Sequence, residues 1–141
     1  MCGVPSHGGK RLGEMGLKCY VASKWEEKER ARQVMFELVE HGHSITFDWT
    51  TNAKFTTEGA LRDVRGVLDA DVLVCVLEKD LPYRGALLEW GIALGAGKPV
   101  YVIGGSPAVA KNIFSKHPNV KLGWKQFKQD LLGGEDGSKI S

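Results

Sequence analysis

The sequence has few cysteines, no long apolar run and almost no net charge, and each shortage removes a class of protein. Its three cysteines, Cys2, Cys19 and Cys75, lie far apart, so neither a disulfide framework nor a zinc knuckle is indicated. No apolar run approaches the roughly 20 residues of a membrane-spanning helix. The formal net charge is +2, with acids and bases interspersed, which gives no electrostatic footprint for nucleic acid or a membrane surface.

What remains is the composition of one ordinary soluble domain. The chain has 141 residues, of which 43% are hydrophobic and 26% charged, enough for one buried core and too few for a second domain. Reduced cysteines favour a cytoplasmic location. We expect residues 1–16 to be a disordered leader, residues 17–132 to form the domain, and residues 133–141 to be a flexible tail.

Strand and helix signals alternate from residue 17 onward, which is typical of an α/β domain with a parallel sheet. The run DVLVCVL is apolar and β-branched, as expected of a central strand covered on both faces. We therefore predict a single-domain, doubly wound, five-stranded sheet in the flavodoxin-like, Rossmann-like order 2-1-3-4-5. The predicted strands are 17–22, 44–49, 71–77, 100–103 and 120–122. The first predicted helix follows Ser23 and ends at Gly42, and the others cover 58–68, 84–96, a short segment from 107 or 108, and 125–132.

Two local patterns predict how the first helices begin and pack. Ser23 and Glu26 have the spacing of a capping box, in which each side chain satisfies a free amide. In the helix 58–68, helical spacing places Asp63 on the edge of a buried apolar face. That face is predicted to contain Ala60, Leu61, Val64, Val67 and Leu68.

One carboxylate, Glu89, lies in the middle of the almost wholly apolar predicted helix 84–96. At helical spacing it shares a stripe with small residues such as Gly85 and Ala86, which would allow close approach to a backbone or a ligand. Two roles are open for it. It is either a structural acid facing the positive end of the helix dipole or a working group.

Open doubly wound sheets bind ligands beyond the carboxyl ends of their strands, at the switch point. That rule selects residues 23–24, 78–89 and 104–106, and it places Glu89 at the mouth of a site. Asp63 then gives Glu89 a partner. Two carboxylates suit the cleavage of a glycosidic bond, because one can stabilise or bond to the anomeric carbon while the other manages a proton or orients the nucleophile.

The chain resembles the nucleoside 2-deoxyribosyltransferase family and its relatives, the 2'-deoxynucleoside 5'-monophosphate N-glycosidases. The similarity extends from Leu17 to about Phe127 and is centred on RDVRGVLDADVLVCVL and RGALLEWGIALGAGKPVYVI. It implies that Glu89 is the nucleophile that takes the deoxyribosyl group, and that Asp63 helps hold the sugar and positions Glu89. The residues that fit the family pattern are Asp63, Asp71, Glu89, Gly91, Gly97, Lys98 and Pro99.

The resemblance also implies substrate contacts early and late in the chain. The stretch CYVASKW, which contains Cys19, Ser23 and Trp25, looks like the nucleoside-binding opening of the family. Trp49 and Phe47 are alternative platforms for the base. Asn112 matches an asparagine that reaches the 5'-hydroxyl in a neighbouring subunit's site, which implies a homodimer or larger homo-oligomer with sites near the subunit interface.

The group that reads the 5' end of the sugar departs from the family pattern. Transferases carry aspartate and the monophosphate hydrolases serine where this chain has Tyr83. Asp80 or Arg84 from the same loop could make this contact instead, and Tyr83, Arg84 and Gly85 are predicted to bind substrate. Arg84 favours a phosphate, because a guanidinium can bind it with two parallel hydrogen bonds, whereas Asn112 favours a hydroxyl.

Three hypotheses remain for the function. The first is an enzyme that cleaves the N-glycosidic bond of a 2'-deoxynucleoside or its 5'-monophosphate and transfers the sugar to another base or to water. The second is a non-catalytic nucleotide-binding or regulatory domain, supported by Tyr83. The third, a flavin or dinucleotide protein, lacks the G-x-G-x-x-G turn. We expect a small nucleoside or nucleotide as partner, and no cofactor, metal, nucleic acid or membrane.

Overall fold

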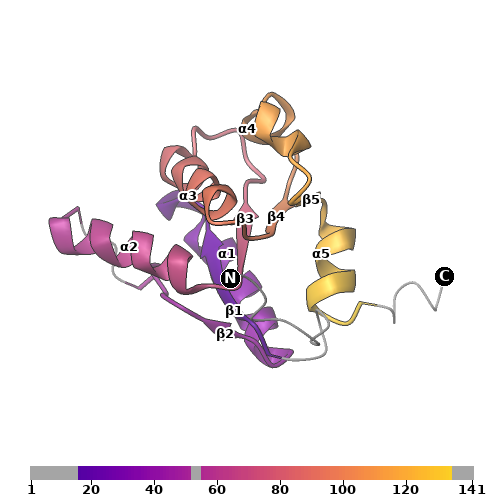
Figure 1. Ribbon diagram of the computed structural model, residues 1–141, viewed down its shortest axis with the longest axis horizontal. Coiled ribbons are helices and arrows are strands. Elements are labelled where there is room, and N and C mark those ends of the chain that lie inside the picture. The colour runs from indigo at the N-terminus through magenta and orange to yellow at the C-terminus, as the bar shows by residue number, and fades with distance from the viewer. Residues whose placement is uncertain (1–15, 52–54, 135–141) are drawn as a thin grey trace.

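The computed structural model describes residues 16–51 and 55–134. Five parallel strands form one sheet in the order β2-β1-β3-β4-β5, with α2 and α3 on one face and α1 and α5 on the other (Figure 1). The predicted fold class and strand order are confirmed. The elements are β1 (Lys18–Ala22), η1 (Trp25–Glu27), α1 (Lys28–Glu40), β2 (Ser44–Ile45), α2 (Thr57–Asp69), β3 (Val72–Val76), α3 (Arg84–Gly95), β4 (Val100–Ile103), α4 (Pro107–Ala110), η2 (Ile113–Lys116), β5 (Val120–Leu122) and α5 (Trp124–Leu131).

The central strand β3 pairs with β1 on one side and β4 on the other. All five of its residues are buried, as its β-branched, apolar sequence predicts for a strand covered on both faces. The last three strands and α3 lie where the pattern places them, within one or two residues. The predicted leader, residues 1–16, lies outside the described residues apart from Gly16, and the tail is described only as far as residue 134.

Strand β2 is shorter than predicted and ends at Ile45. The amide of Thr46 still donates to the Cys19 carbonyl of β1 at 2.9 Å, and side-chain hydrogen bonds follow. The Thr46 hydroxyl donates to the carbonyl of Gly66 at 2.7 Å. Asp48 Oδ1 accepts from the amide of Thr50 at 2.9 Å and closes a turn. From Thr46 onward the side-chain bonds hold this segment against α2 and, through the Trp49 indole and the Val21 carbonyl, against the end of β1.

The predicted capping box is wrong. The 3₁₀ helix η1 is capped by Lys24 without a side-chain bond, and Ser23 Oγ instead donates to the Val76 carbonyl at 2.8 Å. Ser23 therefore ties the end of β1 to the end of β3. Glu26 lies 3.8 Å from Lys24 Nζ in an ion pair.

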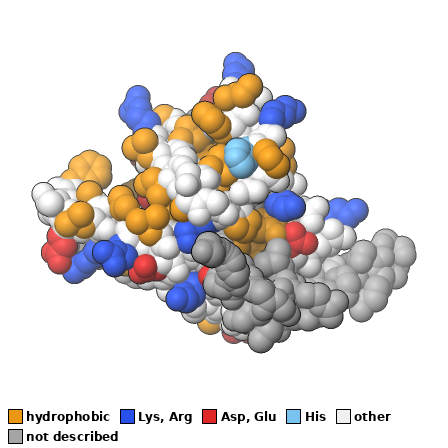
Figure 2. Space-filling view, in the orientation of Figure 1, with side chains coloured by type: hydrophobic (Ala, Val, Ile, Leu, Met, Phe, Trp, Pro, Cys, Tyr) orange, Lys and Arg blue, Asp and Glu red, His pale blue; other side chains and the backbone are white. Residues whose placement is uncertain are grey.

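The apolar face predicted for α2 is only partly buried. Val67 is fully buried, whereas Leu61, Val64 and Leu68 are 65%, 40% and 46% exposed. Figure 2 shows apolar side chains on the face over α2, α3 and α4. The helix thus contacts the sheet along a narrower stripe than its sequence predicts, and its outer apolar side chains remain in solvent. No helix among residues 16–51 and 55–134 is long and apolar enough to cross a membrane.

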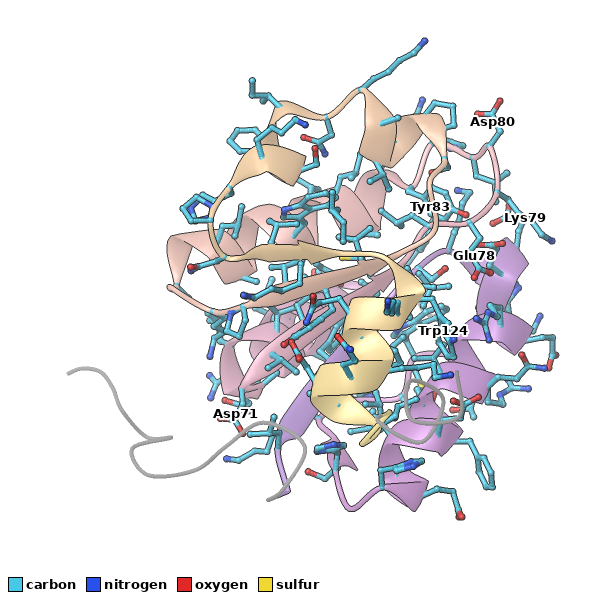
Figure 3. The ribbon with its side chains drawn as sticks, turned by 90° about the vertical axis from the view of Figure 1, so that its right-hand side faces the viewer. Asp71, Glu78, Lys79, Asp80, Tyr83 and Trp124 are labelled. Carbon is cyan, nitrogen blue, oxygen red and sulfur yellow. The ribbon has the colours of Figure 1, made fainter. Side chains whose placement is uncertain are left out.

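The two ends of β3 carry different polar groups (Figure 3). Asp71 precedes the strand and accepts a hydrogen bond from the amide of Lys18 at 2.8 Å, so it joins the starts of β3 and β1. Glu78, Lys79, Asp80 and Tyr83 lie at the opposite, carboxyl end, in the loop between β3 and α3. That end is where the switch-point rule places a ligand.

Candidate functional site

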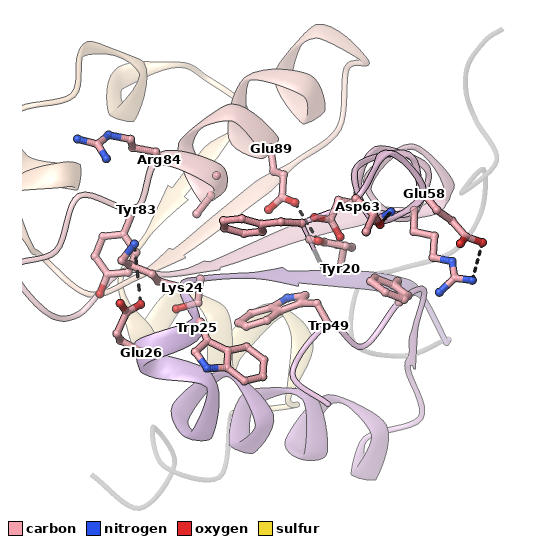
Figure 4. Close-up of a pocket in the computed structure, with 18 residues that line it drawn as sticks. Tyr20, Lys24, Trp25, Glu26, Trp49, Glu58, Asp63, Tyr83, Arg84 and Glu89 are labelled. Carbon is pink, nitrogen blue, oxygen red and sulfur yellow. Dashed lines mark hydrogen bonds and ion pairs between the residues drawn. The ribbon is translucent and has the colours of Figure 1, made fainter. Parts of the chain in front are cut away.

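A pocket of about 530 Å³ opens at the carboxyl ends of β1 and β3. Residues of β1, η1, α2 and α3 and of the segment after β2 line it. Two carboxylates lie on one side of this pocket, and two indoles lie on the other (Figure 4). The carboxylate side contains Tyr20, Asp63 and Glu89, and the indoles on the aromatic side are those of Trp25 and Trp49.

Glu89 lies in the second turn of α3, so it is not a first-turn partner of the helix dipole. The Tyr20 hydroxyl donates a hydrogen bond to Glu89 Oε2 at 2.8 Å. Burial raises the pKa of Glu89 to about 8, and the negative charge of Asp63 adds to that rise while the Tyr20 hydroxyl opposes it. Glu89 therefore changes charge near neutral pH. It can act as a nucleophile when ionised and as a proton donor when protonated.

Asp63 comes from α2 and faces the same tyrosine. Burial raises its pKa, and the Tyr20 hydroxyl lowers it. The phenol has one proton, which it donates to Glu89, so it cannot donate to Asp63 at the same time. A Cβ at Gly66, one turn after Asp63, would lie 2.8 Å from Cδ2 and Cε2 of Tyr20. The absence of a side chain there lets α2 pack directly on the tyrosine ring.

The aromatic side is fixed by polar contacts at its edges. Trp49 is 9% exposed, and its indole nitrogen donates to the Val21 carbonyl at 2.6 Å. Trp25 is 43% exposed and carries the ammonium of Lys28 at 4.1 Å from its ring centroid. Both rings lie across the pocket from Glu89 (Figure 4), which leaves room for a flat apolar group between them and the carboxylates.

Charged side chains of the pocket are mostly paired with one another. Lys24 pairs with Glu26, and Arg62 pairs with Glu58 at 2.9 Å. Arg84 is exposed at the start of α3 and points away from Glu89 in Figure 4. Its guanidinium could meet only the outer end of a ligand that reaches the carboxylates.

Tyr83 lines the pocket, but its hydroxyl is engaged elsewhere. The side chain is fully buried, and the hydroxyl donates to Glu27 Oε1 at 2.5 Å and accepts from the amide of Lys79 at 3.0 Å. Asp80 is exposed in the same loop and does not line this pocket. Tyr83 therefore offers no free polar atom to a ligand, because its side chain is buried and its hydroxyl already has two partners.

The structure brings most of the predicted site residues together. Glu89, Asp63, Ser23, Trp25, Tyr83, Arg84 and Gly85 all line the pocket.

Two predicted contacts are not made in this pocket. Cys19 is fully buried, and its thiol lies 3.9 Å from the Leu17 carbonyl, so the prediction that it contacts substrate does not fit this pocket. Asn112 caps η2 through its own Oδ1, which accepts from the amide of Phe114 at 2.9 Å. It is not among the described residues that line this pocket, and its role in a partner's site stays a prediction.

Tyr20 is the functional residue that sequence reasoning missed. Side chains of a strand alternate between its faces, so Tyr20 faces α2 and α3 while Cys19 next to it faces the opposite layer. A tyrosine in an apolar strand needs a partner for its hydroxyl. Tyr20 could have been identified from this need for a partner, because the two helices that cover the strand both carry acids.

The glycine-rich turn after β4 supports packing rather than this site. Gly104 has a φ of +111°, and a Cβ there would lie 2.5 Å from the carbonyl oxygen of Leu77. The turn thus packs on the backbone that leaves β3. Residues 104–106 are not among those that line the pocket.

No protein-family model matches the chain, and a search of curated proteins finds no match. Within the described part of the chain, no three His, Cys, Asp or Glu side chains are grouped to hold a metal ion. Functional inference therefore rests on the fold, the pocket and the residues named above.

Proposed function

We propose that the protein cleaves the N-glycosidic bond of a 2'-deoxynucleoside or its 5'-monophosphate, with Glu89 as nucleophile. The observation that carries the proposal is the hydrogen bond from Tyr20 to Glu89, with Asp63 beside the same hydroxyl. A carboxylate held by a neutral donor, next to a second carboxylate and opposite two indoles, suits a sugar flanked by a planar base.

The reaction has two displacements. In the first, ionised Glu89 attacks the anomeric carbon, and the base departs with the electrons of the glycosidic bond and takes up a proton from solvent. In the second, water or another base attacks the same carbon, loses a proton to solvent and releases the Glu89 carboxylate, so configuration is retained overall. Positive charge that develops on the sugar is stabilised by the carboxylate of Asp63. The base packs against Trp25 and Trp49.

A second candidate function is non-catalytic nucleotide binding. Its support is the pKa of about 8 for Glu89, which leaves much of this side chain protonated at pH 7 before any ligand binds. The hydroxyl of Tyr83 also supports this candidate, because it is bonded to Glu27 and is not free to contact a substrate. A binding module would retain the pocket and its affinity for a nucleotide without releasing free base.

We extend the proposal to assembly and location. Exposed apolar side chains on α2, including Leu61 and Leu68, support a homodimer or larger homo-oligomer with sites near the subunit interface. Free, buried Cys19 and Cys75 support the cytoplasm as the location.

The test incubates purified protein with a panel of 2'-deoxynucleosides and their 5'-monophosphates, with and without an acceptor base. Chromatography follows base release and exchange, and mass spectrometry of quenched samples seeks a deoxyribosyl adduct on Glu89. Glu89→Gln should abolish both signals while thermal unfolding remains cooperative. Glu29→Gln makes the same change at a side chain that is 76% exposed on α1 and should leave both signals intact. Undiminished base release by the Glu89→Gln variant would overturn the proposal.

A further inference from the structure

A buried hydrogen bond joins the two sides of the pocket. Glu27 ends η1, two residues after Trp25 on the aromatic side. Tyr83 immediately precedes α3, six residues before Glu89 on the carboxylate side. Their side chains meet through the Tyr83 hydroxyl and Glu27 Oε1, and they are 0% and 3% exposed, respectively.

We propose that the Tyr83–Glu27 bond is a positioning element that sets the distance between the aromatic side and the carboxylate side, and so determines affinity for the base of the substrate. The identity of the ligand rests on the proposed function. The positioning role itself rests on contacts within the protein.

The first support is the number of segments that one hydroxyl ties together. It donates to Glu27 of η1 and accepts from the amide of Lys79 in the loop after β3. The carbonyl of Tyr83 accepts the amide of Leu87 at 2.9 Å, which starts α3. A single residue thus connects η1 and the loop through its side chain and the first turn of α3 through its backbone.

The second support is the backbone of Tyr83. Its φ is +50° and its ψ is +39°, and it is the one non-glycine residue with positive φ among residues 16–51 and 55–134. Left-handed backbone is uncommon for a bulky side chain and persists where its surroundings fix it. The buried ring and the two bonds of its hydroxyl supply that restraint.

The third support is the weakness of the alternative link. Arg30 of α1 binds the Glu78 carboxylate in the same loop through two guanidinium nitrogens, the shortest bond being 3.1 Å, but the two side chains are 29% and 35% exposed. Water therefore screens this ion pair more than it screens the buried bond between Tyr83 and Glu27. Glu27 does not line the pocket, so it acts through Tyr83 and not on the substrate.

The experiment compares three variants by amide hydrogen exchange and by ligand affinity. Tyr83→Phe removes the bond, and Glu27→Gln keeps an acceptor for it. Tyr101→Phe is the matched control, because it removes a phenol bonded to Asp130 at 2.7 Å, between β4 and α5. Affinity for a deoxynucleoside is measured by calorimetry in the Glu89→Gln background, where no turnover interferes.

For Tyr83→Phe we expect faster exchange in peptides 24–28 and 78–84 together, and an affinity about tenfold weaker, the size of one lost positioning contact. In the active background KM should rise more than kcat falls. Glu27→Gln should stay close to the parent, and Tyr101→Phe should change neither peptide. If Tyr83→Phe does not fold, Glu27→Asp replaces it, since it withdraws the acceptor by one methylene.

Unchanged exchange in either peptide, unchanged affinity, or an equal effect of Tyr101→Phe would overturn the positioning role. If the parent binds no deoxynucleoside, the assignment of the ligand fails with the proposed function. Coupled exchange of the two peptides then decides the positioning role without a ligand.

Discussion

The hydroxyl of Tyr20 lies 2.8 Å from Oε2 of Glu89 and donates to it, and the electrostatics of the site depend on this bond. Burial raises the pKa of Glu89 and so favours its protonated form, and the negative charge of Asp63 raises this pKa further. The phenol opposes both, because a donated hydrogen bond stabilises the ionised carboxylate. Each group can be removed by a substitution that preserves shape, so each contribution can be measured separately.

Glu89→Gln should stabilise the protein at high pH. The folded pKa of Glu89, about 8, lies above its ordinary value of 4.5, so the folded state holds a proton that the unfolded chain releases. The contribution of Glu89 to the free energy of unfolding of the wild type is therefore fully present below pH 4.5, and it is lost as the pH rises to about 8. Glutamine removes this loss and still accepts from Tyr20.

Urea unfolding of both proteins between pH 5 and pH 9 checks this. The stability difference in favour of Glu89→Gln should grow with pH and level off above pH 8, reaching a few kcal/mol at most, since one pKa unit corresponds to about 1.4 kcal/mol. A difference that stays constant across this range would contradict the raised pKa.

Tyr20→Phe should raise the pKa of Glu89 further. The variant removes the hydrogen bond that lowers this pKa and leaves the burial and the charge of Asp63 in place. In ¹³C NMR of labelled glutamate carboxyls, the titration of Glu89 should move to higher pH than in the wild type. The rising limb of kcat/KM should move the same way, because only ionised Glu89 attacks. A titration that moves to lower pH would show that the phenol does not stabilise the carboxylate.

Asp63→Asn should move the same titration in the opposite direction. It removes the negative charge that raises the pKa of Glu89 and retains a side chain of the same size. The Glu89 titration should therefore move toward its ordinary value, while kcat falls because the positive charge on the sugar loses its partner. Opposite displacements in the two variants, measured on one carboxyl, separate hydrogen bonding from charge repulsion.

Much of the fold could be predicted from local pattern. The apolar, β-branched runs at β3 and β4 identify buried parallel strands, and Glu89 is conspicuous because it is an acid in an apolar helix. The end of β2 could not be predicted, since it depends on Thr46 reaching a carbonyl of α2. Hydrophobic periodicity does not record such side-chain bonds.

The location of the site could be predicted from the sequence, but the hydrogen bonds of its two buried phenols could not. The switch-point rule places Glu89 at the mouth of the site, and Asp63, predicted as its partner, lines the same pocket. The hydrogen bonds of the two buried phenols join residues that are far apart in the sequence: Tyr20 contacts Glu89, 69 positions later, and Tyr83 contacts Glu27, 56 positions earlier. Neither spacing leaves a periodic signal in the sequence.

Gly66→Ala should damage the site without changing any charge. A Cβ at Gly66 would lie 2.8 Å from two carbons of the Tyr20 ring and 3.2 Å from Cβ of Phe47, which is closer than packed carbons approach. The helix α2 or the ring must move. Either movement separates Tyr20 from Asp63, which lies one turn earlier on the same helix.

The matched control is Gly91→Ala in α3, where a new Cβ meets nothing within 4 Å. Alanine is the better helix former, so this variant should gain roughly 0.5–1 kcal/mol. Gly66→Ala should instead lose about 1–3 kcal/mol, the usual cost of overpacking, together with most base release. Urea unfolding and the base-release assay on both variants measure the contrast. Equal stability of the two variants would mean that α2 can withdraw freely, and full activity of Gly66→Ala would mean that the site does not need the close packing of α2 on Tyr20.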